Sequence, residues 1–91
     1  MTILVTGATG NVGRLVVDEL LALGAEDVRA LTNKPEHAGL PPSVEVARGW
    51  VGRPGSMVEA LKGVDRMYLA PHLPTNAEVC RLAADAGVTR I

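Results

Sequence analysis

Three glycines, Gly7, Gly10 and Gly13, recur at intervals of three residues in the stretch TGATGNVGR near the start of the chain. Glycine loses more backbone freedom on folding than any other residue, so this spacing indicates a backbone that turns tightly or approaches another group closely. The stretch follows a short apolar run, residues 3–5, and precedes apolar residues at helical spacing. A glycine-rich loop between a strand and a helix is typical of phosphate binding, because the first amides of the helix point at the anion.

Each glycine has an expected role in such a loop. Gly7 would let the chain leave the strand in a tight turn, Gly10 would let the backbone approach a pyrophosphate, and Gly13 would let the helix pack closely. The expected backbone cradle comprises Gly7, Ala8, Thr9, Gly10, Asn11, Val12 and Gly13. The alternative is a glycine-rich turn that binds nothing, and the strand–loop–helix order favours the phosphate site over it.

The pattern along the rest of the chain alternates strands with helices. Strands are expected at residues 3–5, 28–32, 44–46 and 66–70, with a proline-rich loop at residues 33–42. Helices are expected at residues 12–23, 54–61 and 75–86, the last one started by a capping box of Thr75 and Glu78 and each one ended by a glycine. Residues 89–91 have the pattern of another strand's beginning. Such alternation implies a parallel sheet with right-handed crossovers.

The composition excludes several classes of protein. The 91 residues are enough for one domain, residues 1–91, and a hydrophobic content of 47% excludes a disordered chain. The net charge of −1 gives no basic surface for nucleic acid. No apolar run approaches the ~20 residues of a membrane helix, and no signal peptide is present. With Cys80 as its one cysteine, the chain is expected to be a soluble cytoplasmic protein.

Several stretches together resemble a known family. They are TGATGNVGR, VRALTNKPE, VEVARG, GVDRMYLAP and AADAGVTRI. The chain is similar to the NmrA-like atypical short-chain dehydrogenases/reductases, which include NAD(P)H-dependent quinone and azo-compound reductases and redox-sensing regulators without activity. The resemblance covers nearly all of the chain but only the first half of the family's nucleotide-binding domain. It implies a truncated Rossmann-like α/β fold, with parallel strands in the order 3-2-1-4 and residues 89–91 as the start of a fifth.

The resemblance implies a dinucleotide cofactor, and the residues after the second strand bear on its identity. NAD-binding relatives place an acid there to hold the ribose diol, whereas this chain has Thr32, Asn33 and Lys34. Without an acid to repel a 2′-phosphate, and with Arg14 and Lys34 to attract one, NADP(H) is expected to be preferred over NAD(H). The family often has an arginine at the position of Asn33, so the phosphate clamp of this chain is weaker than the family pattern.

Three further residues are expected beside the cofactor. Relatives commonly show Gly-Asp after the third strand, with the carboxylate facing the adenine, but here Gly49 is followed by Trp50. The indole of Trp50 either stacks on the purine or caps the core. Ala70 and Pro71, at the end of the fourth strand, stand where the family lines the cofactor ribose.

No catalytic residue is identified. Classical short-chain dehydrogenases use Tyr-x-x-x-Lys, but Tyr68 is followed four residues later by His72, so Tyr68 is interpreted as a packing residue. His37 and His72 have no Ser or Cys partner nearby in sequence, which gives a triad no support. Cys80 is expected to be an inert thiol on a helix, and no metal-binding set accompanies it.

The sequence therefore favours the NAD(P)H-binding domain of an NmrA-like oxidoreductase that reduces a small oxidised substrate, such as a quinone or an azo compound. Two alternatives stay open: a non-catalytic dinucleotide-binding or redox-sensing module, and a truncated product without activity of its own. The outer edge of the fourth strand is expected to be nearly bare, and an unpaired edge recruits another strand. A two-fold dimer through that edge is therefore predicted.

Overall fold

A four-stranded parallel sheet forms the centre of the protein, whose computed structural model describes residues 1–70 and 74–91. The strands are β1 (Thr2–Val5), β2 (Val28–Thr32), β3 (Glu45–Arg48) and β4 (Val64–Tyr68). Their order across the sheet is β3-β2-β1-β4, and each pair of neighbours runs parallel. The predicted α/β class and the predicted strand order are confirmed.

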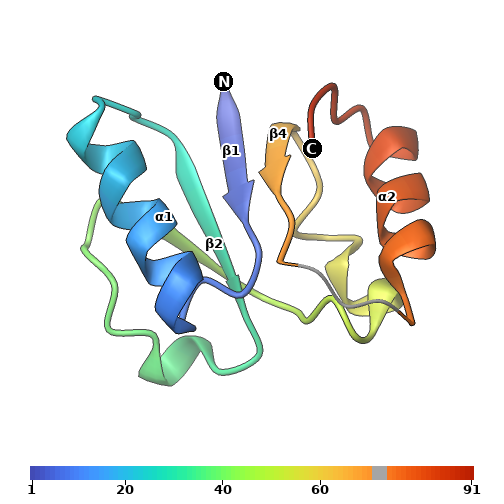
Figure 1. Cartoon of the computed structure of the whole chain (residues 1–91), viewed down its shortest axis with the longest axis horizontal. Helices are drawn as coiled ribbons and strands as arrows, with labels where there is room; N and C mark the ends of the chain where they lie inside the picture. The colour runs from blue at the N-terminus through green and yellow to red at the C-terminus, as the bar shows by residue number, and fades with distance from the viewer. Residues whose placement is uncertain (71–73) are drawn as a thin grey trace.

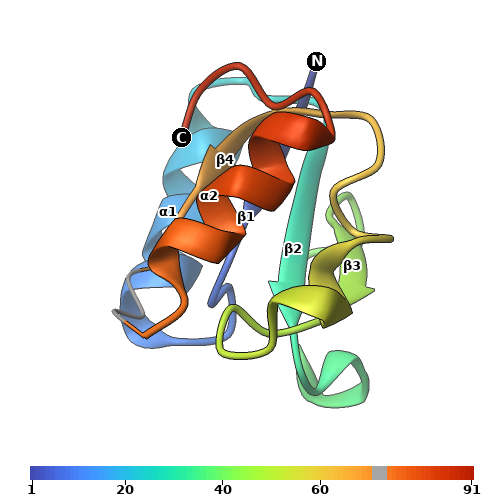
Figure 2. The ribbon, with the colours of Figure 1, turned by 90° about the vertical axis from the view of Figure 1, so that its right-hand side faces the viewer.

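One helix covers each face of the sheet (Figure 1; Figure 2). Helix α1 (Asn11–Ala22) packs on one face and α2 (Asn76–Asp85) on the other. In β1, Leu4 belongs to the core cluster on the α2 side and Val5 to the cluster on the α1 side, and both are fully buried. A central strand buried on both faces explains the continuous apolar run at the start of the chain. Neither helix of the described residues has the length and hydropathy needed to cross a membrane.

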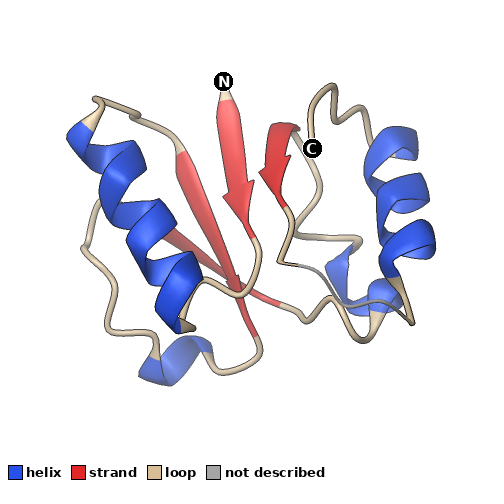
Figure 3. Ribbon diagram, in the orientation of Figure 1, coloured by secondary structure: helices blue, strands red, loops and turns tan. Residues whose placement is uncertain are grey.

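The carboxyl ends of the four strands lie along one edge of the sheet, because all the strands run in the same direction. β1 leads directly into α1, β2 leads into the short 3-10 helix η1 (Pro35–His37), and β3 leads into a second one, η2 (Pro54–Met57). Figure 3 shows these connections along the lower edge of the sheet. Ligands of open α/β sheets bind outside this edge, so the site is sought there.

Two predicted strands have the wrong boundaries. β4 begins at Val64, two residues earlier than predicted, because Gly63, with φ 75°, ends the preceding turn directly before it. β3 begins and ends later than predicted, and it does not alternate between buried and exposed positions. Val44 is buried just before the strand, whereas Val46 within it is 37% exposed.

The predicted helix over residues 54–61 is also wrong, because only η2 is helical there and the chain continues in turns to Gly63. The predicted capping box at the start of α2 does not form. Thr75 is the N-cap residue with ψ near 0°, not the extended backbone that a capping hydroxyl requires. Its hydroxyl instead donates to the carbonyl oxygen of Val51 at 2.7 Å, which ties the start of α2 to the segment after β3.

The last residues of the chain lie beside β4. The amide of Thr89 donates to the carbonyl oxygen of Asp65 at 2.8 Å, and the amide of Met67 donates to that of Arg90 at 2.9 Å. These bonds make a single parallel bridge rather than a strand. Residues 89–91 thus make only the beginning of the expected fifth strand. They pair with the outer edge of β4 over part of its length.

Candidate functional site

The loop between β1 and α1 is folded around the peptide group of Gly7. Gly7 has φ 60°, in the left-handed region where a side chain is strained. A Cβ on Gly13 would overlap the carbonyl oxygen of Gly7 and lie 2.7 Å from its carbonyl carbon, whereas a Cβ on Gly10 would lie 3.3 Å from that oxygen. Gly13 is therefore required sterically, because α1 begins directly against the loop backbone. The close packing expected of Gly13 is present, and the partner is the loop rather than the sheet.

The first turn of α1 leaves its amides available to an anion. The first helical hydrogen bond runs from the amide of Arg14 to the carbonyl oxygen of Gly10 at 3.0 Å, so the amides of Asn11, Val12 and Gly13 have no acceptor within the helix. Gly10, the N-cap residue, supplies no side-chain cap, and the first turn holds no acid. The positive end of the helix dipole thus faces the loop without a protein counter-charge, as phosphate sites require.

Two buried threonine hydroxyls hold the loop to the strand ends. Thr6 is fully buried, and its hydroxyl accepts a hydrogen bond from the amide of Ala70 at 2.7 Å. Thr32 is 3% exposed; its hydroxyl accepts from the amide of Lys34 at 3.1 Å and lies 3.3 Å from the hydroxyl of Thr9. These bonds fix the ends of β1, β2 and β4 relative to one another. The predicted site residues at these strand ends therefore have defined positions.

Two adjoining cavities open at the carboxyl edge. The glycine-loop cavity, of about 220 Å³, is lined by Gly7, Thr9, Leu31, Thr32, Asn33, Gly49, Trp50, Val51 and Ala70. The β3-side cavity, of about 390 Å³, is lined by Asn33, Arg48, Gly49, Trp50, Arg53 and Ser56. Because Asn33, Gly49 and Trp50 line both, the two cavities share a wall. One end of the combined space is glycine backbone, and the other end is an aromatic ring with two arginines.

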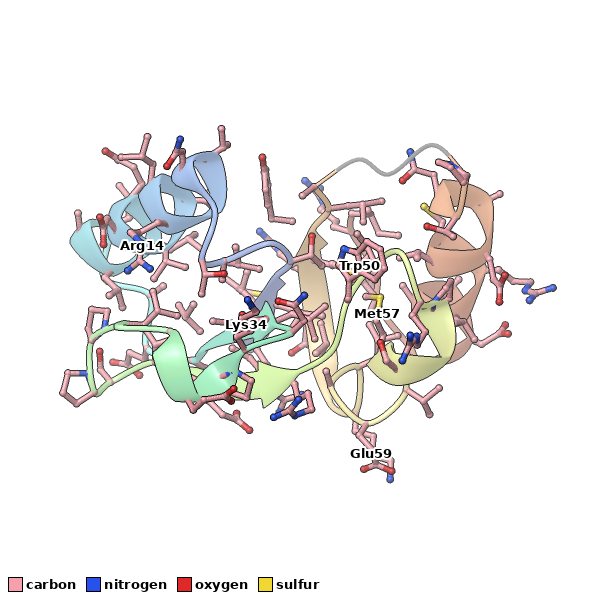
Figure 4. All side chains as sticks on the ribbon, turned by 90° about the horizontal axis from the view of Figure 1, so that it is seen from below. Arg14, Lys34, Trp50, Met57 and Glu59 are labelled. Atoms are coloured by element: carbon pink, nitrogen blue, oxygen red, sulfur yellow. The ribbon has the colours of Figure 1, made fainter. Side chains whose placement is uncertain are left out.

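Trp50 stands between the two cavities on a tight turn. The amide of Arg53 donates to the carbonyl oxygen of Trp50 at 3.0 Å, and the amide of Trp50 donates to the hydroxyl of Ser56, also at 3.0 Å. The indole lies over Gly52, where a Cβ would be 2.6 Å from the ring atom Cε2. Figure 4 shows the ring at the carboxyl edge of the sheet. Trp50 is 47% exposed, so a large part of its surface is open at the carboxyl edge.

The two cations predicted to attract a 2′-phosphate differ in their surroundings. The guanidinium of Arg14 donates to the carbonyl oxygens of Ala38 at 2.8 Å and Gly39 at 3.2 Å, so it holds the segment after η1 against α1. Lys34 is exposed at the start of η1. Figure 4 shows Lys34 between Arg14 and Trp50. Lys34 is the exposed one of these two cations, and Arg14 positions the segment that follows η1.

Sequence reasoning missed Arg48, Arg53 and Ser56. Arg48 ends β3, forms an exposed ion pair with Glu36 at 3.3 Å, and reaches the carbonyl oxygen of Asn33 at 3.5 Å. The signal was the run RGWVGRPGS, which places an arginine on either side of the tryptophan. Alternation along an extended backbone puts residues two apart on the same side, so Arg48 could have been paired with Trp50 from sequence alone.

The remaining candidates are placed as follows. Tyr68 is half-buried against the core cluster on the α1 side, as the packing interpretation expects. Cys80 is half-buried on α2. Pro71 and His72 lie outside the described residues, as does the side chain of His37. Within the described part of the chain, these residues bring no acid–base pair to the carboxyl edge.

Comparison with known proteins bears directly on this geometry. A family model described as NAD(P)H-binding matches residues 7–91, from the first glycine of the loop to the last residue. In sequence, the chain is 40% identical over 90 residues to the (4-alkanoyl-5-oxo-2,5-dihydrofuran-3-yl)methyl phosphate reductase of Streptomyces griseus, covering 98% of this chain and 31% of that protein.

Solved structures of reductases share the fold. The triphenylmethane reductase of Citrobacter sp., complexed with NADP(H), matches with a TM-score of 0.84 and 35% identity, over 97% of this chain and 35% of that one. An NADPH-dependent quinone oxidoreductase of Escherichia coli matches with a TM-score of 0.78 and 29% identity, over 96% and 32%. The chain spans about a third of the length of these relatives. The chain belongs to the NAD(P)H-binding family, and these likenesses confirm its resemblance to the NmrA-like short-chain dehydrogenases/reductases.

Proposed function

We propose that the chain binds NADP(H) across the carboxyl edge of its sheet, with the pyrophosphate over the glycine loop. The observation that carries the proposal is the glycine-loop cavity, which joins that loop to the ends of three strands. Gly7, Ala8, Thr9 and Gly10 supply the close backbone, and the free amides of residues 11–13 supply donors for the phosphate oxygens.

The nicotinamide half of the cofactor lies toward β4 in this proposal. Ala70 lines its ribose, and Thr6 holds the amide of Ala70 in place through its buried hydroxyl. A Cβ on Gly7 would lie 3.2 Å from the Cβ of Ala70, so the two strand ends approach closely beside the cavity. This close approach supports a site that uses backbone surface from both β1 and β4.

We propose that NADP(H) binds more tightly than NAD(H). The residue at the end of β2 is Thr32, whose hydroxyl bonds to the amide of Lys34, so no carboxylate stands where NAD-binding proteins hold the ribose diol. Lys34 adds positive charge there. Calorimetric titration should give a lower dissociation constant for NADPH than for NADH, with a ratio that shrinks as salt screens the charges. Lys34→Glu should reverse the order, and a wild-type preference for NADH would contradict the assignment.

The reaction we propose is reduction of a small oxidised substrate such as a quinone or an azo compound. NADPH supplies the hydride, and this chain's residues hold the dinucleotide in one orientation. The support is the likeness to a quinone oxidoreductase and to other reductases, of which the chain spans about a third. Loss of NADPH absorbance at 340 nm, with a quinone as acceptor, tests it. Tight NADPH binding without turnover would instead favour a dinucleotide-binding or redox-sensing module.

We also propose that two copies associate through the outer edge of β4. Beyond the single bridge to Arg90, a groove of about 590 Å³ runs beside β4, lined by Ile3, Val16, Leu20, Arg66, Met67, Tyr68, Leu69, Arg90 and Ile91. Ile91 is 56% exposed at its end. Light scattering after size exclusion should show a dimer at micromolar concentration. Ile91→Asp should yield monomer, Leu23→Asp on exposed α1 surface should not, and a monomeric wild type would refute the proposal.

A further inference from the structure

The β3-side cavity carries more positive charge than the end of β2 alone provides. Arg48 and Arg53 line it together with Asn33, Trp50 and Ser56. Both arginines are exposed and come from the end of β3 and the turn that follows it. Within the described residues, no carboxylate lies within ion-pairing distance of Arg53, and the partner of Arg48 is Glu36.

The position of Arg48 is tied to the end of β2. Its register partner across the β2–β3 pair is Thr32, and one of its guanidinium nitrogens lies 3.5 Å from the carbonyl oxygen of Asn33. A cation from the neighbouring strand therefore reaches the residue after β2. Asn33 itself carries no charge, so Arg48 delivers positive charge to this point from β3.

The position of Arg53 is fixed by the turn that also carries Trp50. The hydroxyl of Ser56 lies 2.6 Å from the carbonyl oxygen of Arg53 and 3.3 Å from that of Trp50, and it accepts from the amide of Trp50. One side chain thus holds both the ring and the base of the arginine. A purine stacked on the ring of Trp50 would lie in the cavity that Arg53 also lines.

The ion pair between Arg48 and Glu36 is easily exchanged. The two side chains are 68% and 56% exposed, and ion pairs so exposed contribute little net stability. A phosphate monoester carries between one and two negative charges near neutral pH and accepts paired hydrogen bonds from a guanidinium. Such a group can replace the carboxylate of Glu36 as the partner of Arg48. The displaced carboxylate stays nearby, and its negative charge weakens the binding of the phosphate.

We propose that Arg48 and Arg53 bind the 2′-phosphate of NADP(H) and, together with Lys34, determine the preference for NADP(H) over NAD(H), and that Glu36 weakens this binding by pairing with Arg48. This inference rests on the proposed function, because it assigns the adenosine end of the same site. It adds charges on and after β3 to the one that Lys34 supplies after β2, whereas an arginine directly after β2 is the expected arrangement.

The test compares NADPH with NADH, and adenosine 2′,5′-bisphosphate with ADP, for the full chain and its variants. Trp50 is the one tryptophan of the sequence, so quenching of its fluorescence reports binding at this cavity, and calorimetry supplies independent constants. Arg53→Ala and Arg48→Ala should each lower the NADPH-to-NADH affinity ratio about tenfold, as loss of a charge-assisted bond predicts. Glu36→Gln should raise the ratio about threefold by removing the competing carboxylate.

Two controls match these changes. Glu59→Gln removes a carboxylate from another exposed pair, with Lys62 at 3.1 Å, and Figure 4 shows Glu59 far from Trp50. Arg81→Ala removes a positive charge from exposed surface of α2. Neither should change the ratio. An unchanged ratio in both arginine variants, with tight wild-type binding, would overturn this inference and leave the proposed function standing. A wild-type chain that binds neither dinucleotide would overturn both.

Discussion

Two loops at the same edge of the sheet are built in opposite ways. The loop from Gly7 to Gly13 is shaped by backbone, because α1 starts so close to Gly7 that position 13 has no room for a side chain. The segment from Gly49 to Gly63, which we call the β3–β4 connection, is shaped by side chains. The buried side chain of Met57 anchors it in the core, and the hydroxyl of Ser56 accepts a hydrogen bond from the amide of Trp50 and so holds the turn.

The difference decides which loop can be recognised in the sequence. A steric requirement for glycine leaves a spaced pattern that is visible without any structure. Anchoring by one methionine and one serine leaves no pattern, since both residues are common in many settings. Substitutions in the glycine loop should therefore act by crowding its backbone. Substitutions in the β3–β4 connection should act by removing or adding side-chain contacts.

The largest effect is expected for Gly13→Ala. The added methyl group overlaps the carbonyl of Gly7, and neither backbone can move without displacing α1. We expect a loss of more than about 3 kcal/mol of unfolding free energy, beyond the usual range for overpacking because the partner is backbone. Denaturant unfolding followed by circular dichroism measures it.

Gly55→Ala is the matched control for that substitution, because a Cβ at Gly55 has open space around it and its φ is not in the left-handed region. It should change the unfolding free energy by less than about 0.5 kcal/mol. Equal effects at Gly13 and Gly55 would show that backbone crowding does not shape the glycine loop.

The next effect in size is expected for Met57→Ala in the β3–β4 connection. Met57 is fully buried in the cluster under α2, and Figure 4 shows it close to Trp50 in projection. Removing its side chain leaves a cavity, and we expect a loss of about 2–3 kcal/mol. Val58→Ala, at a neighbouring position that is 50% exposed, should cost under about 0.5 kcal/mol in the same unfolding experiment. A loss at Met57 as small as that at Val58 would mean that the connection is anchored elsewhere.

Gly10→Val should act on binding rather than on folding. The residue has φ −78° and ψ 172°, an extended conformation that valine adopts readily, and its Cβ meets the Gly7 carbonyl oxygen at 3.3 Å. The two added methyl groups would occupy the space assigned to the pyrophosphate. NADPH affinity should fall by well over tenfold, more than ~1.4 kcal/mol, with the circular dichroism spectrum preserved. Unchanged calorimetric affinity in the folded variant would refute the cradle.

The smallest effect on stability is expected for Gly52→Ala. The new methyl group overlaps the ring of Trp50, which is the movable end of a half-exposed side chain, so the ring should rotate away. Unfolding free energy should change by less than about 1 kcal/mol, while the emission maximum of the tryptophan shifts. Gly55→Ala should leave the emission unchanged. An unshifted spectrum in Gly52→Ala would show that the ring does not rest on this glycine.

The fold was predictable from sequence to the extent that backbone burial and glycine spacing determine it. β2 was predicted with its observed ends, and α1 to within one residue at each end, because apolar periodicity and a terminal glycine mark them clearly. The predicted helix after Pro54 failed because proline at a first turn does not distinguish a 3-10 turn from an α-helix. The Thr75 capping box failed because Val51, far away in sequence, takes the hydroxyl.

The candidate site, too, was predictable from sequence only in part. The glycine loop and the end of β2 were located from sequence, whereas Arg48 and Arg53 were not. Their place at the cavity depends on how the chain turns after Gly49, and that turn is set by the hydroxyl of Ser56 six residues beyond Trp50 in the sequence. Alternation could have paired Arg48 with Trp50, but no local pattern carries information on the contact that places Arg53.

The central place of β1 has a consequence for how the protein folds. β1 precedes the other three strands of the sheet in the sequence, yet it lies between β2 and β4, and its register partners in β4 are more than 60 residues away in sequence. On the ribosome, Leu4 can pair with Arg29 early but must wait for Met67 before its second neighbour arrives. Non-local pairing of this kind slows folding. Time-resolved hydrogen exchange should therefore show protection of the β1–β2 pair before that of the β1–β4 pair.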